Sequence, residues 1–354
     1  MQLQLKNIGM IKEATVKIDG LTVIAGENDT GKSTVGKALY YSCIIDEKVE
    51  EISNAIIRFS SATEKKFQKE IQENMQKNIS QQVISKELQE KIAQEFKKTL
   101  NEHNDKDDMR KNFQEKIFYF QLADNSIVNL DNKIKSNVIF IDTPILTNFF
   151  DFFSILDTIQ NNIEYDINTY PNLSRSLYLQ LKLKLKKETT LDKYEQLNIL
   201  KEIIGGELKT DAMGQLVFSK ENGSIHNVNA VATGIKNFGI LQLLLKNNYL
   251  TKDAILIIDE PEVHLHPKWQ LQYAKFIVNL VKDGVKVFIN SHSPYMIEAL
   301  KRYSDKEKLQ DKTNFYLASD GIIEDKNKLQ EIYEKLSEPF DEFDKMDSDI
   351  LNGK

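Results

Sequence analysis

The sequence predicts an α/β fold built around a parallel sheet. Two features carry this prediction: strongly apolar strands alternate with helices, and one strand leads into a glycine-rich turn that opens a helix. The strands are LTVIAG, AILIID and KVFINS, and helices follow from about Ser33, Pro267 and Pro294. Continuous apolar runs of this kind are typical of strands buried on both faces. The chain has 354 residues, of which 41% are hydrophobic, so it can bury a substantial core.

The first part of the chain is expected to begin this sheet, leave it and return to it. In residues 1–45, the N-terminal lobe, LQLKNIG and EATVKI predict an antiparallel pair, and a turn at Asp19-Gly20 leads into LTVIAG. Residues 46–118 are rich in Lys, Glu and Gln, and their apolar residues recur at nearly helical spacing, which predicts a helical, arm-like insertion. Residues 119–147, which contain NVIFIDTP, predict the return to the sheet.

Residues 148–204 predict a second helical insertion. Within it, LYLQLKLKLKK alternates at the period of a strand, but Leu and Lys favour helices; both assignments stay open, and the helix is favoured. Residues 205–354 are expected to form the C-terminal lobe of the same domain. Its predicted elements are strands around QLVFSK, a turn at Asn222-Gly223 and a helix from Thr233 to Leu245, followed by the strands and helices of the second half.

Composition limits the classes of function. The formal net charge is −6, so the whole molecule does not attract nucleic acid or an anionic membrane, and a nucleic-acid site would have to be a local basic patch. The single cysteine, Cys43, excludes an internal disulfide. The first residues lack the pattern of a signal peptide, and no apolar run approaches the roughly 20 residues that cross a bilayer. We therefore expect a cytoplasmic protein without a membrane partner.

The stretch from Gly26 to Ser33, GENDTGKS, fits the phosphate-binding pattern G-x-x-x-x-G-K-[ST] without a mismatch. Glycines let the backbone N–H groups approach phosphate oxygens, and the helix N-terminus favours an anion. Lys32 supplies a compact positive charge for the β and γ phosphates, and Ser33 can ligate Mg²⁺. The predicted cofactor-binding residues here are Asn28, Asp29, Thr30, Gly31, Lys32, Ser33 and Thr34.

Two further strands end in polar residues suited to chemistry on a phosphate. AILIIDEPEVHLHP places Asp259 and Glu260 at a strand end, where the first carboxylate can hold Mg²⁺ and the second can polarise a water. KVFINSHSPY places His292 at another strand end, where it could contact the γ phosphate or the attacking water. His264 and His266 lack the accompanying ligands of a zinc site.

The order of phosphate loop, helical insertion, ATGIKNFGILQLLL, ILIIDEPEVHLHPKWQ and INSHSPY resembles the ABC-like AAA-family ATPases, the group of RecF, the SMC proteins and the OLD-family nucleases. The resemblance implies a phosphate-loop (P-loop) ATPase head of the ABC type that uses ATP and Mg²⁺. It implies Asp259 and Ser33 as the Mg²⁺-associated pair, Glu260 as the catalytic base and His292 as the γ-phosphate sensor.

The same resemblance implies that the head closes on ATP as a dimer, with each site completed by the partner's signature motif. Thr233 and Gly234 stand in the place of that signature, and residues 263–267 in the place of the loop that communicates across the dimer. An alternative is that Thr233 is an ordinary helix N-cap.

Other parts of the family pattern are less clear. The family's coupling Gln has only a weak match in Gln121, and Asp142-Thr143-Pro144 either lines the site or, as we favour, only ends a strand. The segment after Met296 is too short for the nuclease domain of the OLD family, so we expect no nuclease activity of the chain's own. The resemblance then implies a separate effector protein and a role in bacterial anti-phage defence.

Our leading hypothesis is an ATP-hydrolysing switch that works as a homodimer or higher homo-oligomer and regulates a partner effector. One alternative is a DNA-repair or chromosome-associated ATPase whose lysines follow nucleic-acid phosphates, with two candidate clusters: Lys65, Lys66, Lys69, Lys97 and Lys98, or residues 182–187. Another is a nucleotide-binding scaffold without turnover, against which the intact Glu260 argues. A transporter motor is the least favoured.

Overall fold

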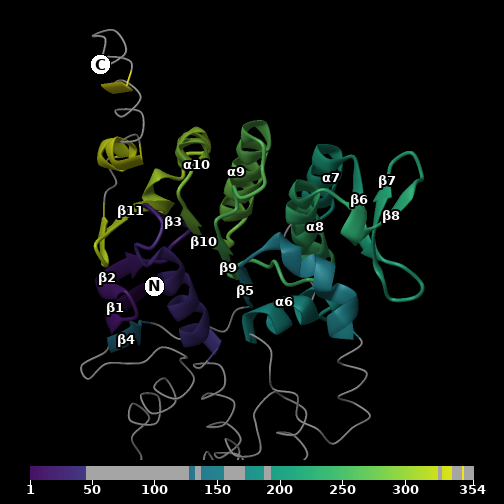
Figure 1. Ribbon diagram of the computed structural model, residues 1–354, viewed down its shortest axis with the longest axis horizontal. Coiled ribbons are helices and arrows are strands. Elements are labelled where there is room, and N and C mark those ends of the chain that lie inside the picture. The colour runs from purple at the N-terminus through teal and green to yellow at the C-terminus, as the bar shows by residue number, and fades with distance from the viewer. Residues whose placement is uncertain are drawn as a thin grey trace, which may run out of the picture.

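A computed structural model describes residues 1–44, 127–131, 137–154, 172–186, 193–325, 329–336 and 345–346. The predicted insertion at 46–118 and Gln121 lie outside these residues. Among the described residues, none of the helices combines the length and the hydropathy needed to cross a bilayer. One large sheet organises the described part of the chain, and helices cover both of its faces (Figure 1).

The large sheet has nine strands in the order β4-β1-β2-β12-β11-β3-β10-β9-β5. The neighbours from β11 to β5 pair in parallel, whereas β1 pairs antiparallel with both β2 and β4, and β11 with β12. This mixed sheet with helices confirms the α/β prediction. The strands are β1 (Gln2–Ile8), β2 (Ile11–Lys17), β3 (Leu21–Ala25), β4 (Ile127–Leu130), β5 (Val138–Ile141), β9 (Ile255–Asp259), β10 (Lys286–Ser291), β11 (Thr313–Ser319) and β12 (Ile322–Asp325).

The central strands are apolar throughout because both of their faces are buried. Leu256 and Ile258 of β9 belong to one core cluster, whereas Ile255 and Ile257 belong to the cluster on the opposite face. Helix 32–44 contributes to the second cluster, and the first contains residues of α8, α9 and α10. Strand β1, in contrast, alternates between buried and exposed residues over most of its length. The two layers of helix hold the ends of the parallel strands in place.

Helices and helical turns follow the described strands or connect them, and a second sheet lies beside α7 and α8 at the right of Figure 1. This sheet is antiparallel in the order β6-β7-β8, and the predicted turn at Asn222-Gly223 joins its last two strands. The remaining bounds are η1 (Pro144–Phe149), α6 (Asn172–Lys182), α7 (Lys193–Ile204), β6 (Gly206–Thr210), β7 (Leu216–Lys220), β8 (Ile225–Asn227), η2 (Val228–Ala230), α8 (Thr233–Lys246), α9 (Pro267–Lys282), α10 (Pro294–Lys306), η3 (Gln310–Lys312) and a helix at 329–336.

The stretch LYLQLKLKLKK is a helix only in its first half. Helix α6 ends at Lys182, and the next residues leave the helix. The Leu185 N–H donates to the carbonyl of Asn247 (3.0 Å), and the Asn248 side chain donates to the carbonyl of Leu185 (2.9 Å). These tertiary hydrogen bonds replace the helical ones, which local propensity could not reveal.

Candidate functional site

The phosphate loop joins β3 to helix 32–44. Within the loop, Asp29 (φ 64°) and Gly31 (φ 90°) have left-handed backbone conformations. A Cβ on Gly31 would lie 2.4 Å from Cδ1 of Ile11, so the position favours glycine for both its conformation and its space. The Thr30 hydroxyl donates to the carbonyl of Glu27 (2.9 Å) and closes the turn. Asn28 and Asp29 are exposed, whereas Thr30, Ser33 and Thr34 are half-buried.

Lys32 lies folded into this loop. Its side chain is buried, and Nζ donates to the carbonyl of Glu27. Burial lowers the pKa of the Lys32 amine, while the nearby carboxylates, Glu260 and Asp259 foremost, oppose that effect. The amine therefore lies among the acidic groups from the other strand ends, and it bonds to a carbonyl that a phosphate oxygen can replace.

Ser33 and Asp259 meet although they are far apart in the sequence. The Ser33 hydroxyl donates to Oδ1 of Asp259 (3.0 Å), and the Asn290 side-chain amide donates to the same oxygen (2.9 Å). Asn290 stands directly opposite Asp259 in the register of β10 and β9. A hydroxyl and a carboxylate oxygen are ligands that Mg²⁺ prefers, so this pair fits the predicted metal role. Asn290, which the sequence did not single out, orients the carboxylate.

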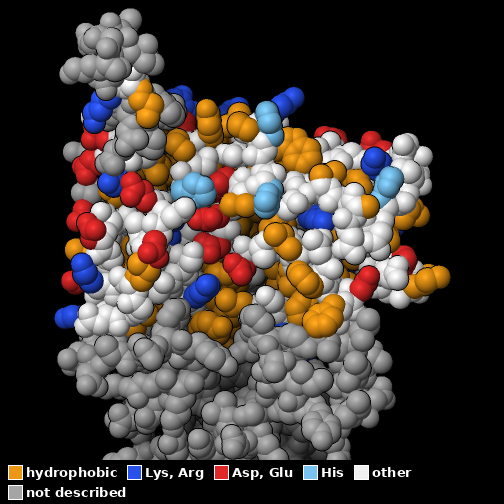
Figure 2. All heavy atoms as spheres, in the orientation of Figure 1, with side chains coloured by type: hydrophobic (Ala, Val, Ile, Leu, Met, Phe, Trp, Pro, Cys, Tyr) orange, Lys and Arg blue, Asp and Glu red, His pale blue; other side chains and the backbone are white. Residues whose placement is uncertain are grey.

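Glu260 and His292 lie at the ends of β9 and β10. Glu260 has a left-handed backbone (φ 46°), and its N–H donates to the carbonyl of Asn290 (3.0 Å). Nδ1 of His292 lies 3.4 Å from Oε1 of Glu260 and 3.4 Å from Oε1 of Glu262. The Glu260 and His292 side chains are 33% and 41% exposed, so both can reach a bound substrate and water. Figure 2 shows acidic and histidine side chains side by side over the region of β9 and β10.

Asp142 also lies at this edge. In the parallel pair β5 and β9, Ile141 stands opposite Ile258, which brings Asp142 beside Asp259. Burial raises the pKa of the Asp142 carboxyl, the charge of Asp259 raises it further, and Lys37 lowers it. Thr143, next along the chain, caps η1 through its hydroxyl. The favoured interpretation of this segment as only a strand end was incomplete, because it contributes a carboxylate beside the predicted metal ligand.

The start of α8 differs from the N-cap interpretation. Ala232 is the N-cap residue and makes no side-chain hydrogen bond, so Thr233 is the first helical residue rather than the cap. A Cβ on Gly234 would lie 3.0 Å from the Trp269 ring, so the glycine permits close packing of α8 on α9. Helix α8 packs against α6, α7, β6 and η1, whereas the phosphate loop is next to β11 and helix 32–44. His266 has a structural role, because its Nδ1 accepts a hydrogen bond at the start of α9.

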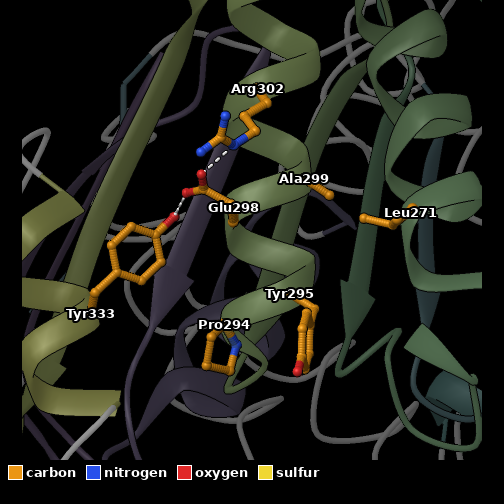
Figure 3. A pocket seen from close by; sticks show the side chains of 7 residues that line it. All are labelled: Leu271, Pro294, Tyr295, Glu298, Ala299, Arg302 and Tyr333. Carbon is orange, nitrogen blue, oxygen red and sulfur yellow. Dashed lines mark hydrogen bonds and ion pairs between the residues drawn. The ribbon is translucent and has the colours of Figure 1, made fainter. Parts of the chain in front are cut away.

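A groove of about 520 Å³ lies along α9 and α10. It runs between α9, α10 and helix 329–336, and mostly apolar atoms line it, including those of Leu271, Tyr295 and Tyr333 (Figure 3). On its wall, the Glu298 carboxylate accepts hydrogen bonds from Arg302 Nε and the Tyr333 hydroxyl. None of the phosphate-loop residues lines this groove.

Comparison with protein families identifies the family of the chain. Residues 43–297 match the model of the AAA ATPase domain. Because the match covers more than two thirds of the chain, the chain belongs to this family of ATPases, as its motifs implied. The match begins after the phosphate loop, so the assignment of residues 26–33 rests on their own pattern and conformation. No curated protein matches the sequence.

Several solved structures are similar to the chain. One is the ADP conformation of MJ1267, an ATP-binding cassette of an ABC transporter, at 13% identity and a TM-score of 0.42, with 96% of each chain covered. The Smc head domain bound to the C-terminal domain of ScpA from Pyrococcus furiosus has 11% identity and a TM-score of 0.40, with 95% of this chain and 99% of that chain covered. At these identities the similarity concerns the fold alone.

Proposed function

We propose that this ATPase binds ATP with Mg²⁺, hydrolyses it, and uses the cycle to switch a homodimer between an open and a closed form. The observation that carries the proposal is the convergence of three separate motifs. Ser33 from the phosphate loop bonds to Asp259 at the end of β9, and His292 from the end of β10 lies 3.4 Å from Glu260. Each of these side chains has the chemistry that its predicted role requires.

The roles follow from the atoms present. The phosphate loop and Lys32 bind the β and γ phosphates, with the Lys32 amine exchanging the Glu27 carbonyl for phosphate oxygen. Ser33 and Asp259 hold Mg²⁺, which when bound neutralises charge on the phosphates. Glu260 accepts a proton from the water whose oxygen attacks the γ phosphorus, while the bond from that phosphorus to the β–γ bridging oxygen breaks.

The start of α8 and the loop after β9 support the dimer. Thr233 begins a 14-residue helix whose N-terminus has no side-chain cap, so its N–H groups and its hydroxyl are suited to an anion brought by another molecule. Apolar side chains around the loop 263–267 and the first turns of α9 and α10 are exposed: Val263, Leu271 and Tyr295. We propose that a second copy covers this surface and presents its nucleotide to Thr233 and Gly234.

The partner and the process rest on the resemblance. We propose that the insertion at 46–118 contacts a separate effector in a cytoplasmic anti-phage system, with the chain divided at the boundaries given above and without a nuclease activity of its own. Direct action on nucleic acid through residues 182–187 is the competing function. That function requires DNA or RNA binding that falls steeply with salt, and a binding titration in each nucleotide state measures it.

The test of the switch is the solution mass of the Glu260→Gln variant, measured by light scattering with and without Mg-ATP. The substitution keeps the side-chain shape but removes the base, so the ATP-bound form should accumulate. We expect the mass to double with ATP. The Lys32→Ala variant, which should not hold ATP, is the control and should keep one mass. A Glu260→Gln variant that binds ATP without any change in mass would contradict the dimer switch.

A further inference from the structure

Glu262 is a buried carboxylate beside the proposed catalytic pair, and none of the roles above uses it. It lies in the loop after β9, and its side chain is 4% exposed. Its Oε1 accepts three hydrogen bonds from the turn between β10 and α10: from the Ser291 hydroxyl (2.7 Å), the His292 N–H (2.8 Å) and the Ser293 N–H (3.1 Å). One oxygen therefore holds three consecutive residues of the turn that carries His292.

A second set of hydrogen bonds ties the same two segments together. The Ser293 hydroxyl donates to Oε1 of Gln270 (2.7 Å), and the Gln270 amide donates to the carbonyl of Leu265 (3.1 Å). Ser293 and Gln270 are both buried. The loop after β9, which carries Glu260, is thus joined to the His292 turn at two points, through Glu262 and through Gln270.

The geometry of His292 shows what these hydrogen bonds control. Its Nδ1 is buried, makes no hydrogen bond among the described residues, and lies at equal distances of 3.4 Å from Oε1 of Glu260 and of Glu262. The negative oxygens favour the proton on Nδ1, which leaves Nε2 as the acceptor nitrogen of the ring. The main chain of His292 is held by the same Glu262 oxygen. Movement of Glu262 would therefore shift the imidazole relative to Glu260.

We propose that Glu262 is a positioning residue that fixes His292 beside Glu260 and sets the orientation and tautomer of its ring. The proposal rests on the ATP hydrolysis proposed above. A purely structural acceptor for the turn would need only one oxygen, yet Oε2 of Glu262 is also buried and makes no hydrogen bond among the described residues. Burying such a charge is unfavourable, so its retention beside an imidazole supports a role in orienting that ring.

The test compares three full-length variants. Glu262→Ala removes the acceptor, Glu262→Gln keeps an acceptor oxygen without the charge, and Gln242→Ala is the matched control. Gln242 is also a buried side chain that holds two main-chain groups, the N–H of Leu208 (2.9 Å) and the carbonyl of Gly206 (3.1 Å), but it lies near β6. We expect kcat for ATP to fall about 10- to 100-fold in Glu262→Ala with little change in KM, less in Glu262→Gln, and not at all in Gln242→Ala.

Two readouts separate positioning from general damage. In a double-mutant cycle, Glu262→Ala should add little to the loss already caused by His292→Gln, because both act through one group. In nucleotide-free protein with labelled histidines, the His292 ring resonances should move in Glu262→Ala but not in Gln242→Ala. Unchanged kcat and unchanged His292 resonances in a folded Glu262→Ala variant would overturn the proposal. If the wild type hydrolyses no ATP, the proposed function fails, and the resonances alone still decide whether Glu262 positions His292.

Discussion

The phosphate loop and the Glu260–His292 region are built in opposite ways. The phosphate loop takes its shape from consecutive residues: Gly31 supplies a left-handed conformation, and Thr30 and Lys32 bond back to Glu27 within the same loop. The Glu260–His292 region is instead assembled from two segments that follow different strands. Its contacts, such as that of Glu262 with Ser291, join residues about thirty positions apart.

This difference predicts how each region responds to mutation. Changes in the phosphate loop should alter nucleotide binding, because the loop itself is the binding surface. Changes in the Glu260–His292 region should alter turnover while binding survives, because these residues lie beyond the phosphate-binding loop. Four substitutions, taken from the largest expected effect to the smallest, test this contrast.

Lys32→Ala should have the largest effect. The buried amine is a positive charge within the phosphate loop itself and bonds to its backbone, so its loss should weaken ATP binding on the order of 100-fold or more. Calorimetric titration with Mg-ATP measures the change. Lys6→Ala, at an exposed position of β1, is the matched control and should bind like the wild type. Wild-type affinity in Lys32→Ala would show that nucleotide binds elsewhere.

His292→Gln should reduce kcat roughly 10- to 100-fold and leave the affinity for ATP within about threefold of the wild type. The reason is that His292 lies beside Glu260 and its ring is part-exposed toward solvent. Steady-state phosphate release at several ATP concentrations separates the two constants. The control is His226→Gln in β8 of the second sheet, and this variant should leave both kcat and the affinity for ATP unchanged. Weakened binding with unchanged kcat would contradict the division of roles.

Gly31→Ala should weaken ATP binding about tenfold, since alanine disfavours a φ of 90° and its Cβ would meet Ile11. Gly214→Ala is the matched control, because Gly214 has a similar φ of 81° but nothing within 4 Å of an added Cβ. Both variants should lose about 1 kcal/mol of stability from the backbone conformation. Only Gly31→Ala should lose affinity, and equal affinities would show that the loop tolerates distortion.

Glu262→Gln should slightly stabilise the nucleotide-free protein at pH 7. Burial raises the pKa of the Glu262 carboxyl, so the buried charge lowers the stability of the fold once the pH rises above the carboxyl's ordinary 4.5. Glutamine resembles the protonated acid, so Tm should rise by roughly 1–3 °C at pH 7. The difference should vanish near pH 4. A Tm of Glu262→Gln below that of the wild type at pH 7, measured in thermal melts, would contradict a destabilising buried charge at Glu262.

Sequence reasoning succeeded where the information is local. The phosphate loop is recognisable from its short sequence pattern. Strands β3, β9 and β10 are recognisable from short apolar runs, because a strand buried on both faces is apolar throughout. Strand β11 was missed although NFYLA is apolar, since its place beside β3 depends on pairing across most of the chain.

The sequence proposed candidate site residues one by one, but not the contacts between them. Asp142 reaches Asp259 only through the register of β5 and β9, and Asn290 through the register of β10 and β9. In the sequence DEPE, nothing distinguishes Glu262 from the neighbouring acids. Its burial against the His292 turn is seen only in the fold. The N-cap interpretation of Thr233 was wrong by one residue. Thr233 is the first residue of α8, and the N-cap residue is Ala232, which makes no side-chain hydrogen bond.

The most direct test of the central claim is phosphate release from Mg-ATP by the full-length wild type and by Glu260→Gln, measured together with their affinities for ATP. Because Glu260 is the proposed base and lies outside the phosphate loop, we predict affinities within about threefold and a loss of kcat on the order of 100-fold or more in the variant. Equal rates in the two proteins would remove Glu260 from the chemistry. No release from the wild type would contradict ATP hydrolysis itself.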